Sequence, residues 1–372
     1  MSTDVFSPLF SPVTISGLNL RNRIVMSPMS RYRSPGGVPD AAVVDYYRRR
    51  AAAGVGLIVS EATYIDHPGA PVYQNVPHFF GEAALAGWRR VLDAVHGLGA
   101  AMVPQIWHVG NNRKRGAPPD PALPGFGPSK IEQDGQTLVV EMTHDDMRDV
   151  ADSYARSAYS ARELGFDGVA IHGGHGYLLD QFFWPVDNRR DDGYGGTIEN
   201  RCRLAVEVVG AMRRAVGDGF PILFRFSQWK ATDYDARIAE TPEELGLFLR
   251  LLTRAGVDIF DVSTRRFWQS AFDGDPKSLA AWTRHLSHRP VIAVGSIGLD
   301  QPHQSKFFRT ADNVASSVTD LRMVEEGLAR GDFDLAAVGR AILADPQWVE
   351  KARRGAFDEI LPFTRAAMDD YH

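Results

Sequence analysis

Cysteine is almost absent from this sequence of 372 residues, which contains only Cys202. One cysteine excludes an intramolecular disulfide and supplies too few thiolates to hold an iron–sulfur cluster. The first residues also lack a charged leader followed by an apolar segment, so we expect no secretion signal. Both absences favour a cytoplasmic protein, in which Cys202 is a small core residue rather than a reactive thiol.

An excess of basic residues and long apolar runs are also absent. The net charge is -5, with 41 Lys and Arg against 46 Asp and Glu, which is unsuited to a surface that binds phosphate backbones. No run of about 18 apolar residues occurs, so we expect no membrane span. We therefore expect a small-molecule substrate and no nucleic-acid or membrane partner, and a homo-oligomer is compatible with the sequence.

The dinucleotide-binding motif G-x-G-x-x-G is missing, which argues against a doubly wound nucleotide-binding sheet. Short apolar runs instead alternate with amphipathic stretches, which predicts a (β/α)8 TIM barrel as a single domain over residues 1–372. A hairpin over residues 13–20 is expected to close its N-terminal end. The expected strands are 23–28, 56–65, 101–108, 168–172, 222–227, 258–263, 291–294 and 335–338. The expected helices are 39–53, 81–98, 143–164, 198–216, 241–255, 279–286, 311–329 and one after Pro346.

In such a barrel the chemistry gathers at the carboxyl ends of the strands. The richest of these ends carries His172, His175 and Tyr177 among glycines that allow tight turns. These residues alone leave three interpretations open. They form a reaction centre, or the histidines bind zinc in a metal-dependent hydrolase, or they only hydrogen-bond to loop backbone. No third metal ligand is evident, so we expect no metal.

A longer motif narrows this choice. The segment from His172-Gly-Gly-His175-Gly-Tyr177 to Gln181-Phe182, followed by Asn188 to Asp191 and by Tyr194-Gly195-Gly196-Thr-Ile-Glu199-Asn200-Arg201, resembles the signature of the old yellow enzyme family. The likeness begins near Leu9 and continues to Val338-Gly339-Arg340 and Asp345-Pro346, so it covers nearly the whole chain.

This resemblance implies an ene-reductase in which FMN takes a hydride from NADH or NADPH and reduces an enone-type substrate. It implies that His172 and His175 bind the carbonyl oxygen of the substrate, as an oxyanion site does. It also implies that Tyr177 protonates the α-carbon, since a phenol is protonated at neutral pH. A purely structural tyrosine and a non-catalytic flavin-binding protein are the alternatives.

The resemblance also assigns residues to the cofactor. Gln105 is expected to bind the flavin pyrimidine, and Arg225 to stabilise the reduced ring unless it forms an ion pair within the barrel. Pro28, Met29, Ser30 and Ala62 match positions that contact the ring. The FMN phosphate is expected after the seventh and eighth strands, at Gly295, Ser296, Gly339 and Arg340.

Some features depart from the family pattern or stay open. Ser30 stands where many bacterial members have a cysteine, and the stretch 108–111 lacks an arginine, which puts substrate-loop contacts in doubt. Amine dehydrogenases and dienoyl-CoA reductases share the barrel but need a cluster-bearing region, for which cysteines are lacking here. Two roles are open for Tyr32 and Tyr64, which either line the pocket or pack in the core. Two roles are also open for Arg265 and Arg266, which either bind an acidic substrate or the additional phosphate of NADPH, or form a salt bridge in the loop.

Overall fold

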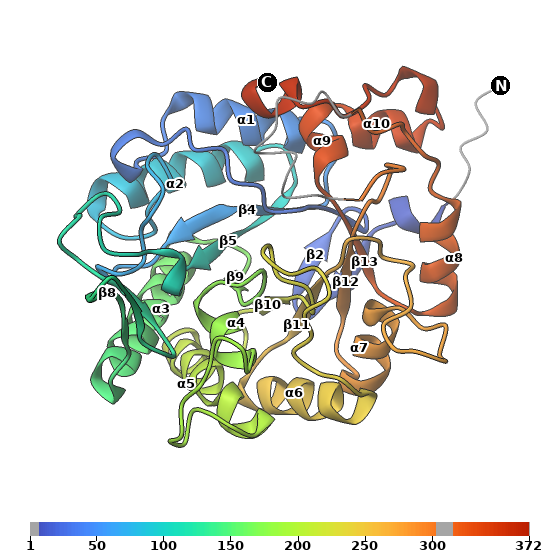
Figure 1. Cartoon of the computed structure of the whole chain (residues 1–372). Coiled ribbons are helices and arrows are strands. Elements are labelled where there is room, and N and C mark those ends of the chain that lie inside the picture. Colours follow the sequence, from blue (N-terminus) through green and yellow to red (C-terminus); the bar gives the residue numbers. More distant parts are fainter. Residues whose placement is uncertain (1–6, 303–314, 372) are drawn as a thin grey trace.

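The computed structural model describes residues 7–302 and 315–371, in which parallel strands close into a barrel (Figure 1). The strands follow one another around it in chain order, and the last, β13, pairs with the first, β3. This confirms the predicted (β/α)8 barrel. Its strands are β3 (Ile24–Met26), β4 (Leu57–Tyr64), β5 (Ala101–Trp107), β9 (Val169–His172), β10 (Ile222–Phe226), β11 (Ile259–Ser263), β12 (Val291–Val294) and β13 (Leu335–Val338).

Long helices surround the barrel, as Figure 1 shows. Side-chain caps fix several of their starts. Thr143 and Asp146 form a reciprocal capping box, and Thr241 caps a helix that begins with Pro242. The surrounding helices are α1 (Ala41–Ala52), α2 (Glu82–His96), α3 (His144–Leu164), α5 (Ile198–Val216), α6 (Pro242–Ala255), α7 (Leu279–Ser287) and α8 (Arg322–Arg330). Shorter helices are α4 (Leu178–Phe183), α9 (Arg340–Ala344), α10 (Trp348–Arg353) and α11 (Ala366–Asp369).

The N-terminal hairpin closes one end of the barrel. Strands β1 (Val13–Ile15) and β2 (Leu18–Leu20) pair in antiparallel fashion. Their buried side chains belong to the same apolar cluster as residues such as Leu57 and Ile259, which point into the barrel. The predicted hairpin cap is confirmed, and it leaves the opposite end, where the strands finish, for the site.

Two parts of the chain differ from the sequence expectation. The helix expected over 311–329 begins at Arg322, and its expected residues 311–314 lie outside the described residues. The described residues before Arg322 form hydrogen bonds other than those of a helix. Ser316 forms a β-bridge with Phe363, and Asp320 accepts the backbone N–H of Arg322. The Pro-rich loop before α3 contains a small sheet of β6 (Gly125–Gly127), β7 (Ile131–Gln133) and β8 (Gln136–Glu141).

None of the described helices is both long enough and apolar enough to span a membrane.

Candidate active site

A cavity of about 440 Å³ lies where the barrel strands end. Because the carboxyl ends of all the strands meet there, it collects residues that lie far apart in the sequence. Most of the residues singled out in the sequence line it. They are Pro28, Met29, Ser30, Tyr32, Ala62, Gln105, His172, His175, Tyr177, Arg225, Arg265, Gly295, Ser296, Gly339 and Arg340.

The loop after β9 carries the central side chains. Gly173 donates its N–H to the carbonyl of Arg225, which ties the loop to the neighbouring strand at 2.8 Å. A Cβ on Gly173 would lie 2.5 Å from the ring of Phe224, so this close approach requires glycine. His175 then takes a φ of 62°, and its N–H donates to the hydroxyl of Ser227 at 3.0 Å. The turn therefore brings His172, His175 and Tyr177 to one wall.

His172 is a neutral hydrogen-bond donor in this environment. Burial, together with the charge of Arg225, lowers the pKa of His172 to about 3. Its Nδ1 accepts the backbone N–H of Gly174 at 3.4 Å, which places the remaining proton on Nε2. The ring of His175 lies 5.1 Å from that of His172, and its Nε2 lies 2.8 Å from the hydroxyl of Ser263. Ser263 therefore holds the second imidazole.

Tyr177 stands against an aromatic wall. Its ring is nearly perpendicular to the rings of Trp107 and His172, at 4.6 and 4.9 Å between ring centres. Burial raises the pKa of the Tyr177 phenol, so the hydroxyl stays protonated. Among the described residues that hydroxyl makes no hydrogen bond. No role was predicted from the sequence for three aromatic residues that also line the cavity, Trp107, Tyr73 and Trp229, although Trp107 lies near the end of the strand predicted over 101–108.

A buried ion pair between Asp180 and Lys230 holds the loop after β9. Asp180 accepts the N–H of Gly176 at 2.6 Å with one oxygen and binds Lys230 at 2.7 Å with the other. Lys230 also donates to the carbonyl of Gln228 at 3.1 Å. Burial raises the pKa of Asp180 to about 6, although Lys230 opposes the shift. The pair was not recognised from the sequence, because its members are 50 residues apart.

Arg225 was interpreted from the sequence either as a contact of the flavin or as a member of an ion pair within the barrel. Its Nε and Nη2 bind the two carboxylate oxygens of Asp261 at 2.7 and 3.1 Å, and Nη2 also donates to Ser27 at 3.0 Å. Arg225 is therefore in an ion pair within the barrel. It also lines the cavity, and its Nη1 makes no hydrogen bond to any described residue.

Gln105 presents a buried amide to the same cavity. The backbone N–H of Gln105 donates to the hydroxyl of Ser60 at 3.0 Å, which fixes the residue on β5. Its side-chain Nε2 is buried and has no hydrogen-bond partner among the described residues. A buried donor without a partner is costly in a protein interior, so the site fits a ligand that carries an acceptor there.

Glycines shape the ends of β12 and β13. Gly295 has a φ of 146°, and a Cβ there would lie 2.5 Å from the hydroxyl of Thr264. Arg340 follows Gly339, and burial lowers its pKa to about 10. Its guanidinium donates to the carbonyl of Gln301 at 2.6 Å. The cation of Arg340 therefore lines the same cavity as Gly295, Ser296 and Gly339.

Two of the candidate residues do not line the cavity. Tyr64 is buried and stacks on Trp107 at 5.2 Å, and its hydroxyl accepts the backbone N–H groups of Val72 and Tyr73. Its role in the structure is therefore packing. Arg266 is not among the lining residues, whereas Arg265 lines the cavity with its guanidinium 4.1 Å from the ring centre of Tyr234.

Glu61 is a buried acid that the sequence analysis left without a role. It lies in β4 where the pairing with β5 shifts between Val59 and Ala62. One of its oxygens accepts the N–H of Arg31 at 2.9 Å, and the other is buried without a partner among the described residues. Burial raises the pKa of Glu61 to about 7, although the bond from Arg31 opposes this.

We expect Glu61→Gln to stabilise the protein at pH 8 but not at pH 5. Because the folded pKa lies above the ordinary value of 4.5, the folded state binds more protons between these values, and stability falls as the pH rises through them. The amide cannot ionise, so the variant should gain up to about 3 kcal/mol at pH 8. Urea unfolding at both pH values measures this, and parallel curves for the two proteins would contradict it.

The described residues around the histidine pair do not include a group of three possible metal ligands. Across residues 7–302 and 315–371, no three His, Cys, Asp or Glu side chains are grouped so that they could hold a metal ion. The buried pocket instead combines imidazole, phenol, amide and guanidinium donors, which suits an organic ligand with acceptor atoms.

Comparison with known proteins agrees with this geometry. The model of the NADH:flavin oxidoreductase / NADH oxidase family matches residues 8–312. This chain belongs to that family. The match includes β3 to β12, and the resemblance to the old yellow enzymes noted in the sequence is confirmed.

Relatives of the family cover most of this chain. A NADH oxidase of Thermoanaerobacter brockii is 32% identical over 95% of this chain, which spans only 52% of that protein. The 12-oxophytodienoate reductase 7 of Oryza sativa subsp. japonica is 30% identical, with 94% of this chain and 89% of the reductase covered.

Solved structures of the family superpose on the barrel. Morphinone reductase in complex with tetrahydroNAD is 28% identical, with a TM-score of 0.76 over 94% of this chain and 91% of that one. Old Yellow Enzyme from Pichia sp. AKU4542 has a TM-score of 0.79 over 98% and 90% of the two chains, and at 24% identity it shows the shared fold.

Proposed function

We propose that this chain is an ene-reductase that uses FMN and NADH or NADPH to reduce the double bond of α,β-unsaturated carbonyl compounds. The observation that carries the proposal is the shared cavity. It holds the imidazole and phenol side chains of His172 and Tyr177 together with the Gln105 amide, which is buried without a partner. Reductases among the relatives and the solved structures support the same class of reaction.

The cavity offers donors suited to FMN. Gln105 Nε2 and Arg225 Nη1 would bind the pyrimidine edge of the flavin. Pro28, Met29, Ser30 and Ala62 would contact the ring, and the phosphate would be bound by Gly295, Ser296, Gly339 and Arg340. Bound FMN would supply the redox chemistry, accepting a hydride from the nicotinamide and delivering one to the β-carbon of the substrate.

His172 would orient and polarise the substrate carbonyl. Its Nε2–H would donate to the carbonyl oxygen, where negative charge develops as the β-carbon gains a hydride. Because His172 is neutral, it would donate a hydrogen bond to the carbonyl oxygen without transferring its proton. His175 would join it by exchanging its bond with Ser263 for one to the substrate.

Tyr177 would complete the reduction by donating its phenolic proton to the α-carbon. The substrate then gains one hydride and one proton, and its double bond becomes a single bond. Tyr177 would regain a proton from solvent, because its raised pKa makes the phenolate a strong base. The aromatic wall of Trp107 limits how far the phenol can turn.

A flavin titration tests this function. The purified protein should show a flavin spectrum, lose it anaerobically when NADH or NADPH is added, and regain it when cyclohexenone follows. Return of the colour with oxygen alone, and none with cyclohexenone, would contradict ene-reduction while leaving the flavin in place. A protein that carries no flavin, even after incubation with FMN, would contradict the cofactor assignment.

A further inference from the structure

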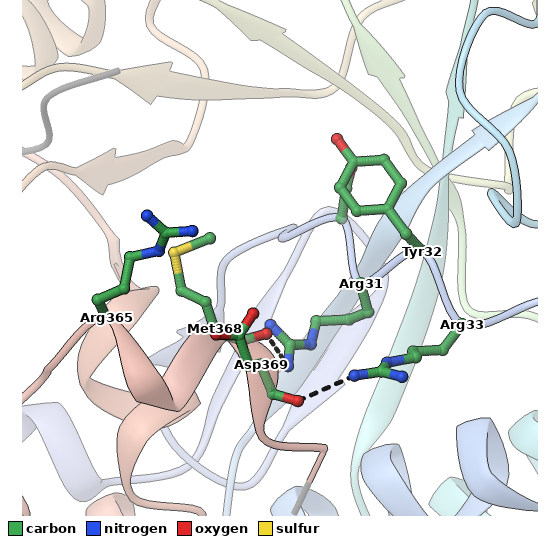
Figure 2. A pocket seen from close by; sticks show the side chains of 7 residues that line it. Arg31, Tyr32, Arg33, Arg365, Met368 and Asp369 are labelled. Atoms are coloured by element: carbon green, nitrogen blue, oxygen red, sulfur yellow. Dashed lines mark hydrogen bonds between the residues drawn. The ribbon is translucent and has the colours of Figure 1, made fainter. Parts of the chain in front are cut away.

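A second pocket adjoins the main cavity on the side of the C-terminal segment. Its volume is about 240 Å³, and the arginines Arg31, Arg33 and Arg365 line it (Figure 2). Ser30, Arg31, Tyr32 and Met368 line both spaces, so the two share a wall. A ligand whose reacting part lies beside Tyr177 would thus be able to extend into this second pocket.

The arginines enter the pocket from two parts of the chain. Figure 2 shows Arg31 and Arg33 extending from the loop after β3 toward the C-terminal segment that carries Arg365. Nη2 of Arg31 donates to the carbonyl of Met368 at 3.0 Å, and Nη2 of Arg33 donates to that of Asp369 at 2.9 Å. The guanidinium carbon of Arg31 also lies 5.6 Å from the ring centre of Tyr371.

These contacts satisfy N–H groups but do not neutralise the charge. In the described part of the chain, neither Arg31 nor Arg33 forms an ion pair with a carboxylate, and Nε of Arg31 is buried without a partner. Three of the lining residues are arginines, and Asp369 is the single acid among them. Glu61 lies behind the loop and binds the backbone N–H of Arg31.

We propose that this pocket is an anion subsite, which receives a carboxylate or phosphate carried by a ligand of the main cavity. Arginine suits this task, since its planar donors match both oxyanions. The anion comes either from an acidic tail on the enone or from the additional phosphate that distinguishes NADPH from NADH. The subsite rests on the proposed function for the identity of these ligands, but its binding is measured without turnover.

The test compares binding ratios in the wild type and in Arg33→Gln/Arg365→Gln. Calorimetry with the flavin-loaded protein gives Kd for NADP⁺ against NAD⁺, and for cyclohexanone against cyclohexanone with a carboxylate on a short alkyl chain. Each lost arginine should reduce the preference for the charged ligand about tenfold, because a charge-assisted hydrogen bond contributes about that factor. High salt should reduce the wild-type preference in the same direction.

The two sources give different results. Loss of the NADP⁺ preference alone supports the phosphate, and loss of the carboxylate preference alone supports an acidic enone. Arg322→Gln removes one such charge on exposed α8 and should alter neither ratio. If both ratios stay within twofold in the double variant, the proposal is wrong and the arginines only hold the C-terminal segment. If the flavin titration shows no enone reduction, the proposed function is wrong, but the measured ratios of Kd for charged and uncharged ligands still test the anion subsite.

Discussion

Replacing Tyr177 with phenylalanine is expected to slow enone reduction by about 10²–10⁴-fold, the range typical of a lost general acid. Bleaching of the flavin by the nicotinamide should change little, since that half-reaction needs no proton from the phenol. The fold should tolerate the change, because the hydroxyl makes no hydrogen bond among the described residues and the ring contacts with Trp107 remain. Stopped-flow measurement of the two half-reactions separates these effects.

The matched control for this variant is Tyr159→Phe, which removes the hydroxyl of an exposed tyrosine on α3 and should leave the rates of both half-reactions unchanged. Equal losses in the two half-reactions of Tyr177→Phe would count against a proton donor and favour a packing role. A loss confined to the affinity for the enone would instead indicate that the phenol only binds the substrate.

Removal of Lys230 should have the largest effect on stability. Lys230→Met leaves Asp180 buried without its partner, and breaking a buried ion pair from one side costs about 3–5 kcal/mol. Part of this loss should disappear in the double variant Asp180→Asn/Lys230→Met, because the buried charge is gone and the amide oxygen still accepts the N–H of Gly176. Urea unfolding of samples with equal flavin loading measures both free energies.

An exposed ion pair provides the comparison. Arg148→Met breaks the pair with Asp145, in which both side chains are mostly exposed, and it should cost well under about 1 kcal/mol. The loss in Lys230→Met should also shrink as the pH falls toward about 6, the pKa of Asp180 beside Lys230. Without Lys230 the pKa of Asp180 is higher, so Asp180 of the variant takes up a proton first and the unpaired charge disappears. A loss that is small and independent of pH would show that the pair does not stabilise the loop.

Much of the candidate site followed from local patterns. Each barrel strand is a short apolar run, and residues near the carboxyl end of such a run or directly after it lie at the cavity end of the barrel. This rule alone placed His172, Gln105 and Gly295 at the cavity. It left two roles open for Tyr64, lining or packing. The structure shows packing, because the strand pairing shifts near Ala62 and the ring of Tyr64 stacks on Trp107. The small sheet before α3 was missed because its strands are short and rich in glycine and polar residues.

The sequence by itself determined the barrel, its hairpin cap and the motif of His172, His175 and Tyr177, because alternating apolar runs and a continuous motif are local properties of a chain. Only the tertiary structure decided which charges meet. Arg225 is paired with Asp261, 36 residues away, and Arg31 binds a carbonyl 337 residues away. Such partners are set by which strand ends and loops the closed barrel brings together, and no local spacing encodes that distance.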